Sequence, residues 1–338
     1  MTKNEMIIKE FEKLISYVNY EIDSTQDKNE RKKNLFRLQQ FMNALAEIKK
    51  YSKIIKSGDD LKDIKGIGKG IILRINEILK TGKLSEIKSD SSKVKTMESI
   101  EKLKEIYGIG EMKAHELVTK YNITNVNELL DNYYLGKITL NNNVIIGIKY
   151  RDTYKQKIPR NEVTRIDKYL HKIAESIDKE LTVTICGSYR RKKQFSNDVD
   201  CMITHPKIVT MDDLKNKSSY LTKFINELRN NEFILDSLTS DDVETKYMGF
   251  CQYSKKKPVR RIDIRYIPYE SYYSALLYFT GSGSFNQKMR KIAKSKGYKL
   301  SEYGLYKISK SSKSIKLTSE KDAFDILGMD YLDPHERI

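Results

Sequence analysis

An eight-residue pattern occurs twice in the first third of the chain, and it constrains the fold more than any other feature. LKDIKGIG begins at Leu61, and LKEIYGIG begins at Leu103. Apolar residues recur at helical spacing after each copy, so each copy predicts two helices joined by a short Gly-x-Gly hairpin. The hairpin glycines are Gly66, Gly68, Gly108 and Gly110. Glycine lets backbone approach a ligand closely, and the next helix N-terminus offers free N–H groups to an anion.

A large excess of positive charge accompanies this repeat. The 338 residues include 63 Lys and Arg against 46 Asp and Glu, which gives a net charge of +17. Such an excess favours a polyanionic partner such as nucleic acid, although a lysine-rich composition is equally typical of an AT-rich genome. One Gly-x-Gly turn would be a weak signal. Two matched copies in a basic chain indicate contacts to the DNA backbone that ignore base sequence.

The hydrophobic periodicity changes near residue 160 and divides the chain into two parts. Residues 1–55 carry apolar stripes at helical spacing, with a polar loop expected at 20–34 and a flexible joint at 89–96. Beyond residue 160, period-two alternation predicts strands at 181–187, 199–205, 260–267, 306–310 and 314–318. Helices are predicted at 161–178, 212–230, 284–296 and 319–327. A helical N-terminal part is therefore followed by an α+β part.

Nothing in the sequence indicates a membrane segment or an oxidising compartment. No run approaches the roughly 20 apolar residues that cross a bilayer, and charges interrupt the apolar residues of the N-terminus. The three cysteines are isolated and odd in number, which is typical of reduced thiols. The four histidines are scattered, so a zinc site has little support. We expect an intracellular protein that works where the genome is repaired.

Three aspartates on two predicted strands form a candidate metal site. Asp198 and Asp200 are separated by one residue, so both carboxylates project from one face of a strand. Asp263 lies on the polar face of the strand at 260–267. If the two strands are neighbours, the three carboxylates converge, and such hard oxygen ligands suit Mg²⁺. Asp-x-Asp pairs are common surface features, so the pair alone is a weak signal.

A basic turn shortly before these aspartates strengthens the interpretation. Gly187-Ser188 ends a predicted strand, and Arg190, Arg191, Lys192 and Lys193 follow. A small-residue turn with a hydroxyl and clustered guanidinium groups suits a triphosphate. Basic loops are usually solvated faces, but few lie beside a candidate metal site.

Three segments together resemble family X DNA polymerases of the DNA polymerase beta type. They are GSYRR and SNDVDCMITHP within 187–206, RRIDIRYIP at 260–268, and YFTGSGSFNQKMRKIAKSKGYKLSEYGL at 278–305. The resemblance covers essentially the whole chain, including KIPR at 157–160 and SEKDAFDIL at 319–327. It implies an α+β fold with an all-helical N-terminal domain that has two helix-hairpin-helix motifs, a nucleotidyltransferase-type palm sheet and a small α+β thumb-like subdomain. The implied domains are 1–90 (lyase-like), 91–156 (fingers-like), 157–269 (catalytic palm) and 270–338 (thumb-like).

The resemblance also implies roles for individual residues. Asp198, Asp200 and Asp263 match catalytic metal ligands, with Asp263 nearest the primer hydroxyl. Matches to dNTP contacts are Ser188, Arg191, Ser196, Asn197, Tyr278, Phe279, Gly281 and Asn286, the aromatic pair screening the sugar where a 2′-hydroxyl would clash. Matches to DNA contacts are Gly66, Gly68, Gly108, Gly110, Arg261, Arg290, Glu302 and Tyr303. Backbone carbonyls matching Na⁺ or K⁺ sites belong to Lys62, Ile64, Ile67, Lys104, Ile106 and Ile109.

The sequence departs from the family pattern at a position tied to a second activity. Arg74 stands where the family has a lysine that forms a Schiff base with 5′-deoxyribose phosphate. A guanidinium group stays protonated and cannot form that imine. Lyase activity is therefore expected to be absent or to rely on a substitute amine, Lys69 or Lys32. Lys192 and Asn197 also stand where glycine is usual, and asparagine tolerates the left-handed conformation.

The expected function is template-directed DNA polymerisation that fills short gaps during base-excision-type repair. The expected cofactors are two Mg²⁺ ions, with Mn²⁺ as an alternative, which promote transfer from a dNTP to a primer 3′-hydroxyl. The expected partners are gapped or nicked duplex DNA and dNTPs, bound by a monomer with no membrane contact. Template-independent terminal transfer is one alternative, although no long insertion near the candidate site favours it. A DNA-end-binding protein is the other, and the three aspartates argue against it for the whole chain.

Overall fold

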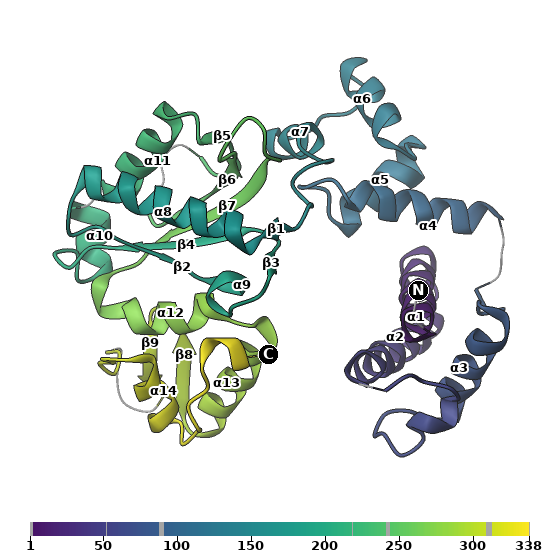
Figure 1. The fold of residues 1–338 in the computed structure, drawn as a ribbon. Helices are drawn as coiled ribbons and strands as arrows, with labels where there is room; N and C mark the ends of the chain where they lie inside the picture. The colour runs from purple at the N-terminus through teal and green to yellow at the C-terminus, as the bar shows by residue number, and fades with distance from the viewer. Residues whose placement is uncertain are drawn as a thin grey trace. The chain divides into compact units, whose positions relative to one another are not determined.

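The chain folds into two compact units in a computed structural model, which describes residues 3–51, 53–87, 91–217, 219–240, 244–308 and 313–337. The units are Met1–Thr139 and Leu140–Ile338 (Figure 1). The described part of the first unit is helical, and the second combines helices with a mixed sheet. The predicted α+β class is therefore confirmed. No helix of the described residues combines the length and apolarity needed to cross a membrane.

The first unit is built from amphipathic helices. They are α1 (Lys3–Ser24), α2 (Lys28–Lys50), α3 (Lys69–Thr81), α4 (Ser91–Lys104), α5 (Glu111–Tyr121) and α6 (Val126–Tyr134), with a 3₁₀ helix η1 at Gly58–Leu61. The loop predicted at 20–34 is wrong, because only 25–27 separate α1 from α2. The Asp27 carboxylate accepts the free N–H groups of Asn29 and Glu30 and so begins α2 earlier than the apolar pattern suggests.

The flexible joint predicted at 89–96 lies partly outside the described residues, and the prediction is wrong for 91–96, which are helical. Residues 91–96 form the first turns of α4, and 88–90 are not described. The helix packs its C-terminal half into the unit through the fully buried Leu103 and the nearly buried Ile100. A polar first turn is compatible with helix because tertiary burial of later residues stabilises the whole element.

The two copies of the repeat adopt matched backbone conformations. Gly66 and Gly108 have left-handed φ angles of 99° and 88°, which only glycine adopts at little cost. Ile67 donates its N–H to the Ile64 carbonyl at 3.0 Å, and Ile109 donates to Ile106 at 3.1 Å. Gly68 and Gly110 then precede α3 and α5 without any side-chain cap, which leaves helix N–H groups open to an outside acceptor. In the first copy the 3₁₀ helix η1 replaces the expected leading α-helix.

The second unit is organised around a five-stranded sheet with the order β2-β4-β7-β6-β5. The strands are β2 (Thr182–Ile185), β4 (Val199–Thr204), β5 (Ile234–Ser237), β6 (Lys246–Cys251) and β7 (Arg260–Tyr266), and a separate pair joins β1 (Ile158–Pro159) to β3 (Phe195–Ser196). Only β4 and β7 pair in parallel. The helices around the sheet are α7 (Asn142–Lys149), α8 (Arg160–Ile177), α9 (Gly187–Arg190), α10 (Met211–Lys217) and α11 (Tyr220–Asn230). Apolar residues of α8 and α11 share one core with the buried face of the sheet.

The predicted helix at 212–230 is in fact two helices, α10 and α11, and residue 218 between them is not described. The polar run at 215–219 interrupts the apolar stripe, and the stripe resumes in α11, whose buried residues are Leu221, Phe224, Ile225 and Leu228. The predicted strands at 181–187, 199–205 and 260–267 are confirmed, each within two residues at its ends.

The C-terminal part of this unit packs on its own small core. It consists of η2 (Tyr269–Ser271), α12 (Tyr272–Thr280), α13 (Gly283–Ser295), a hairpin of β8 (Tyr298–Ser301) with β9 (Gly304–Lys307), α14 (Glu320–Ile326) and η3 (Pro334–Glu336). The strand predicted at 306–310 overlaps β9 at 306–307, and its residues 309–310 lie outside the described residues, whereas the strand predicted at 314–318 is wrong. The hairpin begins at Tyr298 instead, and Ile315 makes only an isolated bridge to Leu305. The missed strand follows Gly297, whose φ of 78° turns the chain out of α13.

Candidate active site

The parallel pairing of β4 and β7 brings the three predicted aspartates together. Asp200 lies directly opposite Asp263 in the register, and Asp198 precedes β4 by one residue. One carboxylate oxygen from each residue lies within 4.8 Å of the others. Ile262, Ile264 and Tyr266 of β7 alternate with Asp263 and are buried in the core beneath α8 and α11. The three aspartates therefore project from the opposite face of the sheet. The convergence expected from the sequence is therefore present.

Burial and mutual repulsion make this cluster unfavourable without a cation. Burial, together with the charges of Asp198 and Asp263, raises the pKa of Asp200 to about 7. Burial likewise raises the pKa of Asp198, against the opposing charge of Arg261. The Arg261 Nη2 lies 2.6 Å from Asp263 Oδ2. The other oxygen of Asp263 is buried and has no hydrogen-bond partner among the described residues. A buried carboxylate oxygen without a donor is a free ligand, so the donor set fits a hard divalent cation.

A glycine turn against Asp200 shapes the next part of the site. Gly187 has a left-handed φ of 52°, and a Cβ built there would lie 1.9 Å from the Asp200 carboxylate oxygen Oδ2. Only glycine therefore fits at the first position of α9 with Asp200 in place. Ser188 follows and donates its hydroxyl to Ser196 at 2.8 Å. Lys192 is left-handed, with φ 59°, whereas Asn197 is not among the left-handed residues of the described chain.

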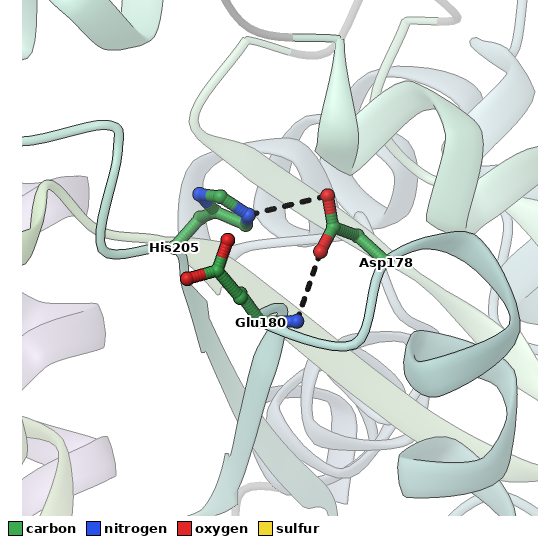
Figure 2. A group of neighbouring side chains, drawn as sticks. All are labelled: Asp178, Glu180 and His205. Carbon is green, nitrogen blue, oxygen red and sulfur yellow. Dashed lines mark hydrogen bonds and ion pairs between the residues drawn. The ribbon is translucent and has the colours of Figure 1, made fainter.

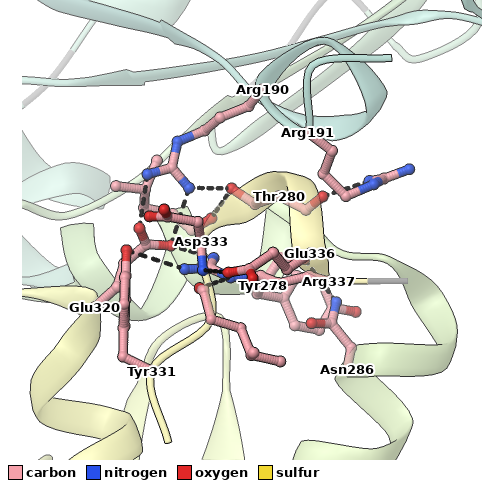
Figure 3. Close-up of polar contacts among 12 residues, drawn as sticks. Arg190, Arg191, Tyr278, Thr280, Asn286, Glu320, Tyr331, Asp333, Glu336 and Arg337 are labelled. Atoms are coloured by element: carbon pink, nitrogen blue, oxygen red, sulfur yellow. Dashed lines mark hydrogen bonds and ion pairs between the residues drawn. The ribbon is translucent and has the colours of Figure 1, made fainter.

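Two arginines of the turn connect α9 to the C-terminal subdomain (Figure 3). Arg191 Nη1 donates to the Thr280 carbonyl at the end of α12. Arg190 donates to the Thr280 hydroxyl at 2.6 Å and forms two bonds to the Glu320 carboxylate, at 2.6 and 3.0 Å. Glu320 also accepts from the fully buried Arg337 at 2.7 Å. No local pattern marked Glu320 for this network, because its partner Arg190 lies 130 residues away in the chain, and Arg337 joins the network only through Glu320.

The aromatic pair predicted to face the sugar lies beside this network. Tyr278 and Phe279 pack edge to face with ring centroids 5.2 Å apart. Phe279 lines a cavity of about 60 Å³ together with Asp200, Asp263 and Arg265, so one ring of the pair does reach the aspartates. The guanidinium of Arg265 lies 5.7 Å from the Phe279 ring centroid.

Neighbouring residues hold Tyr278 in position. Asn286 donates its side-chain amide to the Tyr278 carbonyl at 2.7 Å, and the guanidinium of Arg290 lies 5.6 Å from the Tyr278 ring centroid. Gly281, with φ 66°, directly follows α12, and a Cβ built at this position would lie 3.1 Å from the Arg191 Nη1 atom. Glu302 and Tyr303 form the turn between β8 and β9, where Ser271 donates to the Tyr303 carbonyl at 2.9 Å. Their roles toward DNA stay predictions.

Within the first unit, Arg74 is fixed by a carboxylate. It makes two bonds to Glu86, one of them Nη2 to Oε2 at 2.6 Å, and a further bond to the Gly70 carbonyl at 2.9 Å. Its guanidinium also lies 4.9 Å from the ring centroid of the buried Phe41. Lys69 at the start of α3 is exposed. Lys32 in α2 is exposed as well. Neither has an ion pair among the described residues.

The backbone carbonyls predicted to bind a monovalent cation lie in the two hairpins. They belong to Lys62, Ile64 and Ile67 in one copy and to Lys104, Ile106 and Ile109 in the other. The Ile64 and Ile106 carbonyls each already accept one hairpin N–H bond, which leaves a second lone pair. Cation binding at these carbonyls stays a prediction.

A second acidic group, formed by Asp178, Glu180 and His205, was not singled out by the sequence (Figure 2). The Lys207 N–H donates to His205 Nδ1 at 3.2 Å, and His205 Nε2 lies 3.3 Å from Asp178 Oδ2. Hydrogen bonds from the Glu180 N–H and the Tyr220 hydroxyl, helped by His205, lower the pKa of Asp178 to about 2. Asp178 already accepts hydrogen bonds from the Glu180 N–H at 2.9 Å and from the Tyr220 hydroxyl at 2.7 Å, so we interpret this group as a hydrogen-bonded structural cluster.

Comparisons with known proteins agree with this geometry. The family described as DNA polymerase beta palm matches residues 157–269, DNA polymerase beta thumb matches 275–338, and a helix-hairpin-helix domain matches 3–84. DNA polymerase lambda of Arabidopsis thaliana is 34% identical over 317 residues, and that of Rattus norvegicus is 30% identical over 310. A DNA nucleotidylexotransferase of Xenopus laevis is 28% identical over 330 residues. Each match covers 88% of this chain, but the chain spans only 57%, 52% and 63% of those relatives.

A mixed sheet that gathers three aspartates beside a Gly-Ser turn defines the palm of a nucleotidyltransferase. The palm, thumb and helix-hairpin-helix matches cover most of the chain in the order expected from its motifs. The chain belongs to family X of the DNA polymerases.

Proposed function

We propose that this protein is a template-directed DNA polymerase that fills short gaps during base-excision-type repair. The convergence of Asp198, Asp200 and Asp263 carries the proposal, because three close carboxylates with Arg261 as their ion-pair partner are unfavourable unless a further cation binds them. The substrates are dNTPs and gapped or nicked duplex DNA. The chain acts as a monomer inside the cell, where the genome is repaired, and its three free cysteines fit a reducing compartment.

Each part of the site has a distinct task in this proposal. The three aspartates hold two Mg²⁺ ions, or Mn²⁺ in their place, with Asp263 nearest the primer hydroxyl. When bound, such ions acidify the attacking 3′-hydroxyl and neutralise charge on the leaving pyrophosphate. Residues that bind and orient the dNTP are Ser188, Arg191, Ser196, Asn197, Tyr278, Phe279, Gly281 and Asn286. Those that contact DNA are Arg261, Arg290, Glu302 and Tyr303, with the hairpin glycines.

The proposed domains divide the work along the chain. Residues 1–90 hold the downstream DNA end, and 91–156 act as fingers. Residues 157–269 carry the chemistry as the palm, and 270–338 close over the nascent base pair as a thumb-like subdomain. The hairpin carbonyls would hold Na⁺ or K⁺, which would supply positive charge toward DNA phosphates. Uncapped N–H groups at α3 and α5 support this division, because they suit phosphate oxygens.

Primer extension on a one-nucleotide gap with a 5′-phosphate tests the proposal. Wild type should incorporate the templated nucleotide in Mg²⁺ or Mn²⁺, and Asp263→Ala should reduce the rate by orders of magnitude. Asp330→Ala is the matched control, because Asp330 is exposed and outside the site. If wild type binds the gapped duplex tightly but incorporates nothing with either metal, the polymerase proposal is wrong and a DNA-end-binding role replaces it.

A second candidate activity is template-independent terminal transfer. The similarity to a nucleotidylexotransferase favours it, but the identity is lower than to either DNA polymerase lambda. Single-stranded primers separate the two activities. Extension of an untemplated primer as fast as of a gapped one would favour the terminal transferase.

The contacts of Arg74 bear on a lyase activity. A guanidinium held by Glu86 cannot form an imine, so we propose that Arg74 plays no nucleophilic part. Any lyase reaction then requires another amine, and Lys69 and Lys32 are the exposed candidates. Borohydride trapping on an incised abasic duplex tests this. An adduct that disappears only in Lys69→Ala identifies the substitute, and an adduct that disappears in neither Lys69→Ala nor Lys32→Ala excludes both.

A further inference from the structure

An open groove of about 490 Å³ lies at the edge of the palm sheet, away from the three aspartates. It is lined by the start of β5, which is an edge strand, and by Gln252–Lys255, which follow β6. Lys149 and Tyr150 at the end of α7 complete it. In the sheet register, β6 passes Asp263 at Met248 and only later reaches the groove. None of the lining residues belongs to the proposed dNTP or DNA contacts.

Aromatic rings form one wall of this groove. Tyr169 packs on the buried Phe233 with ring centroids 5.1 Å apart, and Tyr253 meets Tyr169 edge to face at 6.3 Å. Tyr253 is 38% exposed, and Tyr169 is partly exposed. Because Phe233 is only 3% exposed, it holds Tyr169 in one position. An exposed and supported aromatic wall is a surface on which a planar base stacks at little entropic cost.

Cations surround this wall. Lys149, Arg229 and Lys255 line the groove against one carboxylate, that of Glu232. The Lys255–Glu232 pair spans 3.3 Å, but its side chains are 88% and 74% exposed, so the pair contributes little and Lys255 is available to a phosphate. Lys149 forms an ion pair with Asp236 at 2.7 Å, which fixes its position and offsets part of its charge, so Lys255 is the main cation for a phosphate.

We infer that this groove binds an unpaired nucleotide of single-stranded nucleic acid. The base stacks on the exposed ring of Tyr253, which Tyr169 supports edge to face, and the phosphates lie against Lys255 and Lys149. Stacking combined with backbone charge accepts every base, so the site holds a strand without reading its sequence. The groove is open along the sheet edge, which lets a strand enter and leave where a free nucleotide would need an enclosed pocket. Its volume falls in the range of pockets that hold one nucleotide-sized group.

Photocrosslinking with the full chain tests the inference. The probe is a fluorescent hexamer of deoxythymidine with one 5-iododeoxyuridine, added with saturating unlabelled gapped duplex so that the other DNA-binding surfaces are occupied. We expect a crosslink within residues 252–255, removed by excess unlabelled hexamer. Removal by dTMP or dTTP alone at equal nucleotide concentration would show that the groove takes free nucleotides and would overturn the strand-binding inference.

Substitutions supply the second readout. Tyr253→Ala and Lys255→Ala should each weaken hexamer affinity in the same mixture, Tyr253→Ala by about tenfold. Tyr269→Ala is the matched control, because Tyr269 is 49% exposed and outside the groove. Lys255 is exposed, so Lys255→Ala keeps the test valid if Tyr253→Ala does not fold. Affinities equal to that of Tyr269→Ala, or no crosslink within 252–255, would overturn the inference. Extension of a one-nucleotide gap should stay unchanged in both variants, so this result is independent of the polymerase proposal.

Discussion

Replacing Asp200 by asparagine should stabilise the metal-free protein at neutral pH while it removes activity. Burial and the neighbouring carboxylates raise the pKa of Asp200 from 3.8 to about 7. Between these two values the folded protein keeps a proton that the unfolded chain has lost. Stability therefore falls as pH rises from about 4 to about 7, and the loss is constant at higher pH. Asparagine has no charge to lose, so the variant escapes this penalty.

The structure gives the size of the effect. A shift of about three pKa units corresponds to about 4 kcal/mol at roughly 1.4 kcal/mol per unit. For a unit of this size, each kcal/mol moves the midpoint of thermal unfolding by about 2–4 °C, so the gain is about 10 °C. The difference in unfolding midpoint between Asp200→Asn and wild type should be near zero at pH 4 and should reach its full value above pH 7.

Thermal unfolding in EDTA across pH 4 to 8 is the assay. Asp330→Asn, at an exposed site, should track wild type throughout. Added Mg²⁺ should raise the midpoint of wild type but leave Asp200→Asn almost unchanged, which narrows the gap. Two results would refute this reasoning. One is a midpoint difference that does not vary with pH, and the other is a wild type more stable than Asp200→Asn at pH 8. Either would show that ionised Asp200 does not destabilise the metal-free protein.

Three further outcomes follow from particular contacts. Glu162→Gln should lower the free energy of unfolding by about 3–5 kcal/mol, because it leaves Arg260 buried and charged; chemical denaturation measures this, and a loss under 1 kcal/mol would contradict it. Gly187→Ala should cut single-turnover extension by roughly a hundredfold by displacing Asp200, whereas unchanged extension would show that the turn has slack. Affinity for gapped duplex should fall steeply with salt and hardly vary with flanking sequence in anisotropy titrations, and strong sequence dependence at fixed salt would be inconsistent with backbone contacts.

Much of the site could be predicted because its signals are local. Alternation with period two places Asp198 and Asp200 on one face whatever the sheet order, and the repeat gives both hairpins. The pairing of β4 with β7 could not be derived from spacing alone. These two strands are parallel and far apart in the chain, so their register depends on the intervening helices and hairpin.

The missed features depend on contacts that no local pattern records. Arg337 is polar and almost at the C-terminus, where exposure is the usual expectation, yet it is fully buried against Glu320. In the hairpin at 298–307, β8 has no fully buried side chain, so its residues show little alternation between apolar and polar side chains. The αL residue of the basic turn is Lys192, not Asn197, because the turn closes through the Lys192 N–H to the Tyr189 carbonyl at 3.0 Å.

The two acidic groups of the palm show how surroundings, not residue type, decide which carboxylates act. Asp178 receives donors from Glu180 and Tyr220, and its pKa falls to about 2, so its charge is already satisfied by the fold. Among the described residues Asp200 receives no comparable set of donors, and its pKa rises to about 7. A cation gains most where the protein leaves carboxylates unsatisfied, because it then replaces repulsion with coordination. The free energy that makes ionised Asp200 unfavourable in the folded protein is therefore the same free energy that a bound cation recovers.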